Sequence, residues 1–181
     1  MPIASAEDVS AFWRDAGQDR WFKPDGGFDA QIRERFLETH EAAAAGRLDE
    51  WQQTAEGALA LLILLDQFPR NMFRGTPRAF ATDAIALHVA DRAIEKDFDR
   101  KADAQLRSFF YLPYMHSEKL TDQERCLAFY REFGDAEALK YAELHLDAIR
   151  RFGRFPHRNE ILGRQATSEE AAYLDEGGFR G

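Results

Sequence analysis

The apolar run Ala58–Leu65, ALALLILL, constrains the fold of this chain more than any other stretch. It is hydrophobic at every position, which is typical of a helix buried on all sides rather than along one stripe. A membrane span requires roughly 18 such residues, so the run indicates the central helix of a soluble protein. Because no basic segment followed by an apolar stretch opens the sequence, we expect no membrane partner and a cytoplasmic location.

Helical periodicity surrounds this run, and strand patterns are nearly absent. The spacing of apolar residues predicts five helices with both ends defined, over 6–16, 28–45, 82–98, 103–112 and 135–153. It also predicts a helix that begins at 48 and includes the apolar run, and helices that begin at 121 and 167. Capping-box patterns mark three of the starts, with Ser5 and Asp8, Thr121 and Glu124, and Thr167 and Glu170. These helical hairpins predict an all-α fold, 1–181 as a single domain, with tetratricopeptide-like stacking but no detectable repeat.

Composition narrows the classes of partner and cofactor. A formal net charge of −8 gives no overall field that attracts nucleic acid, so we expect no nucleic-acid partner. The only cysteine, Cys126, cannot form an internal disulfide, which fits a reducing compartment. No histidine or acid pair has zinc-ligand spacing, and the glycine patterns of phosphate and dinucleotide loops are absent. We therefore expect no metal and no cofactor.

Polar side chains follow the apolar run at once, in the stretch LLDQFPRNMFRGTPRAF. Asp66 lies at the C-terminal end of the predicted helix, where the helix dipole disfavours an acid unless a cation compensates. Pro69 is expected to end the helix, so that Arg70 and Arg74 leave it near Asp66. One interpretation is that Asp66 anchors this loop through a carboxylate–guanidinium pair, and the other is that it is catalytic.

A second polar segment, RRFGRFPHRNEILGR at 150–164, sets five arginines against the single acid Glu160. Planar guanidinium groups such as those of Arg154 and Arg158 suit a carboxylate or phosphate ligand. The alternative is that these arginines bind helix carbonyls and neighbouring acids. His157, between a proline and an arginine, is a candidate general acid or base.

A third segment, FFYLPYMHSE, contains another histidine beside a carboxylate. Pro113 is expected to end a helix and to leave Tyr114, His116 and Glu118 in a loop, where His116 is a candidate general acid or base near neutral pH. His145 differs, because it shares an apolar helix face and is expected to be a core histidine.

Three blocks of the chain resemble signature blocks of one bacterial family. LLDQFPRNMFRGTPRAFATD, FFYLPYMHSEKLTDQER and HLDAIRRFGRFPHRNEILGR, in this order, are similar to those of the domain of unknown function 924. The similarity extends from Phe12 and Trp13 to the TSEEAAYL tail. It implies an all-helical, tetratricopeptide-like fold and the positions of a site, but no reaction.

Two function classes follow from these segments. In the first, a cleft binds a small anionic or amide-bearing molecule, with Arg70 and Arg154 as clamps and Asp66, His116 and His157 as catalytic candidates. In the second, the helical stack is a scaffold that binds a peptide or protein partner in an open groove. The residues expected to bind the ligand are Asp66, Gln67, Arg70, Asn71, Arg74, Tyr114, His116, Glu118, Arg154, Phe155, His157, Arg158 and Asn159.

We expect the three segments to share one neighbourhood that contains Asp66, Arg70, His116, Arg154 and Asn159. In this arrangement the arginines outnumber the nearest acids expected from the sequence. The surplus positive charge would favour an anionic ligand.

Overall fold

The computed structural model describes residues 2–180 and contains helices but no strand within that range. The all-α class is therefore confirmed. The chain divides into two compact units, residues 1–113, here called unit 1, and residues 114–181, called unit 2. The single-domain organisation and the tetratricopeptide-like stacking stay predictions.

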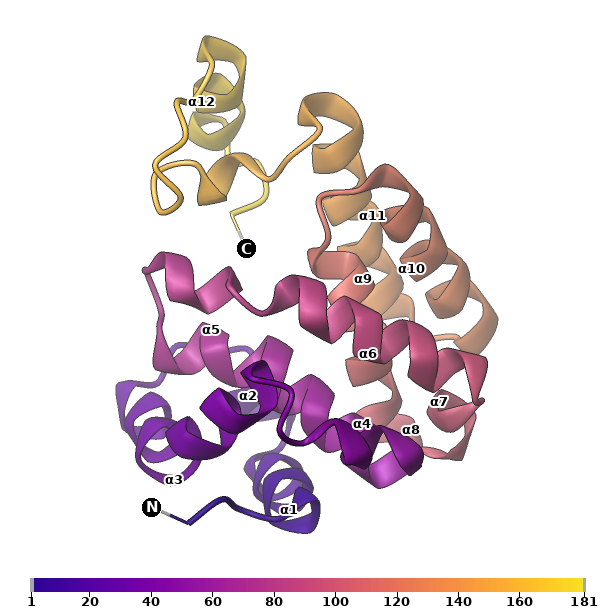
Figure 1. Cartoon of the computed structure of the whole chain (residues 1–181). Helices are drawn as coiled ribbons and strands as arrows, with labels where there is room; N and C mark the ends of the chain where they lie inside the picture. The colour runs from indigo at the N-terminus through magenta and orange to yellow at the C-terminus, as the bar shows by residue number, and fades with distance from the viewer. Residues whose placement is uncertain (1, 181) are drawn as a thin grey trace. The chain divides into compact units, whose positions relative to one another are not determined.

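Unit 1 contains the longer series of helices (Figure 1). They are α1 (Ala6–Ala16), α2 (Gln18–Trp21), α3 (Gly26–Ala44), η1 (Asp49–Gln53), α4 (Ala55–Leu62), η2 (Ile63–Gln67), α5 (Phe68–Met72), η3 (Pro77–Phe80), α6 (Asp83–Glu95), α7 (Phe98–Lys101), α8 (Ala104–Arg107) and η4 (Ser108–Phe110). The short helix α9 (Leu112–His116) contains the boundary between the units.

Unit 2 is built around an antiparallel hairpin of α10 (Leu120–Phe133) and α11 (Ala136–Phe152), which lie side by side (Figure 1). Gly134 adopts a left-handed conformation and ends α10, and the Asp135 carboxylate accepts hydrogen bonds from the first turn of α11. Beyond α11 the chain forms η5 (Pro156–Arg158) and α12 (Ser168–Asp175).

A stack of aromatic rings fills the core of unit 1. Trp13 is fully buried and stacks on Trp21 and Phe28 with ring centroids 5.8 and 6.0 Å apart. Phe68 and Phe109 meet the same indole edge-on. Edge-to-face and offset pairs of this kind add to the stabilisation that burial of the rings provides. The aromatic residues of distant segments therefore hold α1, α2 and α3 against the central helix.

The central helix runs through α4, η2 and α5 and is buried along the apolar run, as the sequence predicted. Its middle part, η2, is a π-helix in which the Phe68 N–H donates to the Ile63 carbonyl. Within residues 2–180, neither this helix nor any other has the length and apolar character needed to cross a membrane.

Pro69 explains why the helix widens at this point and why polar side chains gather there. A proline has no N–H, so Pro69 can donate neither to the Leu65 carbonyl four residues before it nor to the Leu64 carbonyl five residues before it. The Leu64 carbonyl accepts from His40 Nδ1 at 2.8 Å, and the Leu65 carbonyl accepts from the Thr82 hydroxyl at 2.5 Å. Side chains of α3 and of the α6 N-terminus thus replace the missing backbone bonds.

Several predicted helix ends were wrong. Pro69 does not end the helix but lies in the first turn of α5, so Arg70 is helical. Pro113 likewise lies within α9, which makes Tyr114 and His116 helical rather than part of a loop. In both cases the proline occupies the first turn of a helical segment, where its fixed φ is compatible with the helix.

The predicted caps had mixed outcomes. The capping boxes at Ser5 and Thr167 are both present. Thr121 does not cap a helix, because α10 begins one residue earlier with Lys119 at its N-cap. The helix expected from residue 48 is divided into η1 and α4, and the Thr54 hydroxyl caps α4.

The Thr82 hydroxyl should contribute measurably to stability. Because Thr82 is buried, Thr82→Val removes a buried hydrogen bond to the Leu65 carbonyl, and we expect the free energy of unfolding to fall by about 1–3 kcal/mol. Thr82→Ser keeps the hydroxyl and should lose less. Urea denaturation followed by circular dichroism measures both, and equal losses in the two variants would contradict the role of this bond.

Candidate functional site

The predicted site residues lie in both units. Unit 1 contains Asp66, Gln67, Arg70, Asn71 and Arg74, and unit 2 contains Tyr114, His116, Glu118, Arg154, Phe155, His157, Arg158 and Asn159. That all three segments form one neighbourhood stays a prediction. Within each unit, the contacts are specific.

Asp66 is almost completely buried at the end of the π-helix and is paired with Arg70. Its carboxylate lies 3.3 Å from Arg70 Nη1 and accepts a hydrogen bond from the Gln67 amide. Arg70 also forms a two-pronged bond to Asp83, at 2.8 and 3.0 Å. Burial by itself would lower the pKa of the Arg70 guanidinium, but Asp66 and Asp83 outweigh it and raise that pKa. This is the anchoring pair that one interpretation of the sequence predicted.

Arg74 and Asn71 share a different acid, Asp29 of α3. The Arg74 guanidinium binds both carboxylate oxygens at 3.0 Å, and the Asn71 amide donates to one of them at 2.8 Å. Asp29 and Asp83 were not associated with these residues from the sequence. Because they neutralise Arg74 and Arg70, the polar stretch of unit 1 has the chemistry of a structural ion-pair network.

In unit 2, Glu118 joins the segment after α9 to the segment after α11. It accepts two hydrogen bonds from Arg164, at 2.7 and 3.0 Å, and one from the Phe155 N–H at 2.8 Å. Burial would raise the pKa of Glu118, but these bonds outweigh it and lower that pKa. The second and third polar segments therefore lie together in this unit.

Arg154 is bound in a similar way, to Glu170 of α12. The two groups form bonds of 2.6 and 2.7 Å, and Arg154 also donates to the Gln165 carbonyl. The bonds from Arg154 lower the pKa of Glu170 to about 2. Arg154, predicted as a clamp for an anion, thus has an acid of its own within unit 2.

A cluster of histidine and aromatic rings lies beside these pairs. We call it the histidine cluster, and it consists of His116, His145, His157, Phe155 and Phe179. The His145 ring lies 6.4 Å from His116, 5.5 Å from Phe155 and 4.1 Å from Phe179 between centroids. His157 lies 5.5 Å from Phe155 and 5.2 Å from Phe179. Both catalytic histidine candidates therefore belong to one cluster.

Two of these histidines are neutral at pH 7. Burial lowers the pKa of His145 to about 3 and that of His157 to about 4, and the positive charge of Arg158 adds to both shifts. The Tyr141 carbonyl accepts from His145 Nδ1 at 2.7 Å, so Nε2 of that ring carries the lone pair. His145 is thus a satisfied, buried histidine, as predicted.

Buried polar atoms without hydrogen bonds occur in η5 and at its C-terminal cap, Asn159. The Asn159 side chain is 2% exposed, and a hydrogen bond from its amide group helps to lower the pKa of Glu170, whereas its Oδ1 has no hydrogen-bond partner among residues 2–180. His157 Nδ1 is buried and has none in the same range. Such atoms are rare in native proteins, because each loses its hydration without compensation.

The remaining predicted residues contribute packing. Tyr114 is fully buried, and its hydroxyl accepts a hydrogen bond from Arg125, whose guanidinium stacks on the Tyr114 ring. The Arg158 guanidinium lies 4.5 Å from the centre of the Phe155 ring. No group of three or more histidine, cysteine, aspartate or glutamate side chains within the described residues is arranged to hold a metal ion.

Sequence reasoning missed the residues that complete unit 2's site. Glu170 was recognised only as part of a capping box, and Arg164 only as one of several arginines. Phe179 carries no local signal, because a single aromatic residue near the end of a polar tail is not distinguishable from a surface residue. Its contact with His145 depends on tertiary packing.

Comparisons with known proteins give a family but no activity. Residues 9–178 match the model of a family described as "Bacterial protein of unknown function (DUF924)", which confirms the resemblance found in the sequence. Among solved structures, a protein of unknown function from Agrobacterium tumefaciens is 48% identical, with a TM-score of 0.92, over 95% of this chain and 97% of that chain. No match is found among the curated proteins.

The low pKa of His145 predicts a pH-dependent stability. Between its folded value of about 3 and the ordinary value of 6.5, the unfolded chain binds a proton that the folded chain does not. The free energy of unfolding therefore decreases as the pH falls. From about pH 6.5 to about 4.5, His145→Gln should reduce this slope by up to about 1.4 kcal/mol per pH unit.

Urea denaturation at a series of pH values measures the slope. His88→Gln, at an exposed position of α6, is the control for replacing a histidine as such. An unchanged slope in His145→Gln would show that burial does not keep this ring neutral.

Proposed function

We propose that this chain, which belongs to the bacterial DUF924 family, binds a small molecule at the histidine cluster of unit 2 through a carboxylate or carboxamide group. Asn159 and His157 receive that group by hydrogen bonds. We place the protein in the cytoplasm, because its single cysteine cannot form an internal disulfide.

The Asn159 side chain carries the proposal. A structural asparagine at 2% exposure would have both its amide atoms bonded, whereas the Asn159 amide group interacts with Glu170 and its Oδ1 is without a partner among the residues described. Asn159 offers an acceptor and two donors, and the neutral His157 ring offers one of each. A carboxylate offers acceptors for the donors of Asn159 and His157, and a carboxamide offers both donors and an acceptor.

The electrostatic environment favours the carboxylate. Arg158, Arg164 and His116 all lower the pKa of His157, whereas Glu118 acts in the opposite direction. Burial is the largest cause of the low pKa, and Arg158 is the largest electrostatic cause, ahead of the opposing Glu118, so an anionic ligand beside Arg158 would reduce the repulsion at this ring. We therefore expect small carboxylates to bind more tightly than the matching carboxamides.

The proposal assigns different roles to the predicted catalytic residues. His157 is the general base of any turnover, because its Nδ1 makes no hydrogen bond within residues 2–180 and a bound anion would raise its pKa from about 4 towards neutral pH. His116, in the same cluster, is the second acid–base candidate. Asp66 has no part in this site, because it is already bound to Arg70 and Gln67 in unit 1.

The test compares acetate with acetamide and benzoate with benzamide at matched ionic strength. At a hundredfold excess over Kd, binding stabilises the folded protein by about 2.7 kcal/mol, which raises the melting temperature by several degrees. Binding of a carboxylate should also raise the pKa values of His145 and His157 in NMR titrations, because a nearby anion favours the charged imidazolium.

Asn159→Leu separates a binding role from a structural one. The variant removes an unpaired buried Oδ1 but also a hydrogen bond to Glu170, so we expect the melting temperature of the free protein to change little, while the shift caused by the carboxylates is lost. Gln165→Leu, at an exposed position of the same unit, should keep that shift. If Asn159→Leu lowers the stability and responds to carboxylates like the wild type, the asparagine is structural and the proposal fails.

A further inference from the structure

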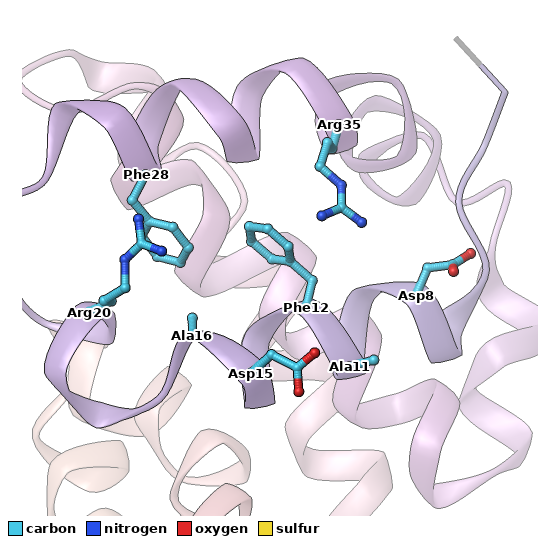
Figure 2. Close-up of a pocket in the computed structure, with 8 residues that line it drawn as sticks. All are labelled: Asp8, Ala11, Phe12, Asp15, Ala16, Arg20, Phe28 and Arg35. Carbon is cyan, nitrogen blue, oxygen red and sulfur yellow. The ribbon is translucent and has the colours of Figure 1, made fainter.

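A polar hollow lies in unit 1, and none of the residues that the sequence predicted to bind a ligand lines it. It has a volume of about 320 Å³ and is lined by residues of α1, α2 and α3 (Figure 2). They are Asp8, Ala11, Phe12, Asp15, Ala16, Arg20, Phe28 and Arg35. A neighbouring hollow of about 310 Å³ shares Asp8 and Arg35 with the first. These two side chains therefore face both spaces.

The wall of this hollow is a stack of rings with a guanidinium at each end. Phe12 and Phe28 are stacked 5.5 Å apart with their planes nearly parallel. Arg35 lies 4.6 Å from the centre of Phe12, and Arg20 lies 4.3 Å from the centre of Phe28. Figure 2 shows both guanidinium groups beside these rings. A guanidinium that lies over a ring keeps its N–H edge available for a carboxylate.

The two arginines differ in their partners. Arg20 is bound to Asp25 at 3.2 Å. Arg35 contacts the rings of Phe12 and Phe36, and within residues 2–180 it makes no hydrogen bond or ion pair. Arg35 is thus the cation of this hollow that is available to an added anion.

Asp8 supplies the opposite charge beside Arg35. Hydrogen bonds from the Ser5 side chain and backbone lower the pKa of Asp8, and the attraction of Arg35 contributes as well. Both bonds are made to Oδ2, so Oδ1 remains available on the other side of the carboxylate. The lining as a whole has two arginines and two aspartates, which gives no net charge but separates the two signs.

We propose that this hollow is a binding site for a free α-amino acid with an apolar side chain. The Arg35 guanidinium binds the carboxylate, the Asp8 carboxylate binds the ammonium group, and the side chain packs against Phe12 and the neighbouring alanines. A plain carboxylate would meet the repulsion of Asp8 and Asp15, and a plain amine would meet that of Arg35. A zwitterion carries one charge of each sign and therefore complements both Arg35 and Asp8. This site does not depend on the function proposed for unit 2.

The test uses L-phenylalanine with two analogues, 3-phenylpropionate, which lacks the ammonium group, and 2-phenylethylamine, which lacks the carboxylate. NMR spectra of backbone amides and arginine Nε–H groups, recorded on the full chain up to about 10 mM ligand, detect dissociation constants in the millimolar range. We expect L-phenylalanine to shift resonances of α1 and α3. It should bind at least about tenfold more tightly than either analogue.

Variants at Arg35 define the role of the guanidinium. Arg35→Gln should weaken binding of L-phenylalanine at least about tenfold, and Arg35→Lys should weaken it too, because an ammonium group cannot bind the carboxylate through two parallel bonds. Arg92→Gln, an exposed arginine of α6 outside the hollow, should leave the affinity unchanged. Since Arg35 is exposed, we expect its variants to fold, and circular dichroism checks this.

Three results would overturn the proposal. The first is that L-phenylalanine shifts no resonance of α1 or α3 in the wild-type protein. The second is that an analogue binds as tightly as the amino acid, which would indicate a hydrophobic contact alone. The third is unchanged affinity in Arg35→Gln. These affinities are measured from the resonances of α1 and α3, whereas binding of a carboxylate at the histidine cluster is followed in unit 2, so the two proposals fail independently.

Discussion

The missing N–H of Pro69 organises the centre of unit 1. A proline inside a buried helix leaves carbonyls that water cannot reach, and each must find another donor. The chain supplies His40 from α3 and the Thr82 hydroxyl from the start of α6, and the helix widens into a π turn between them. These bonds tie two further helices to the central one. The concentration of polar residues behind an apolar run therefore has a structural cause.

Guanidinium–carboxylate pairs also connect helical segments in both units. Arg74 with Asp29 joins α3 to the segment after α5, and Arg164 with Glu118 joins the segments that flank the α10–α11 hairpin. In each pair the two groups satisfy one another at the ends of helices. In the function proposed for unit 2, the groups that would receive a ligand are therefore neutral ones, Asn159 and His157. The many arginines of this chain are thus explained first by structural ion pairs between helices rather than by ligand binding.

Periodicity and caps determined how much of this molecule could be predicted. The buried run through Leu65 and the Ser5 cap are local features, and the sequence shows them directly. The helix ends predicted at Pro69 and Pro113 were wrong, because a proline can end one helical segment or occupy the first turn of the next. Tertiary contacts determine which of the two occurs. The acids that neutralise the arginines were also missed, since Asp29 is 45 residues from Arg74 along the chain. Such pairs follow from packing and leave no mark in the spacing.

The stacked indoles of unit 1 also make the two units spectroscopically distinct. All three tryptophans, Trp13, Trp21 and Trp51, belong to unit 1, and unit 2 contains none. Tryptophan emission therefore follows the melting of unit 1 alone, whereas the far-ultraviolet signal of the helices follows both. Coincident transitions by the two probes would mean that the whole chain melts as one cooperative body, and separate transitions would assign a stability to each half without any label.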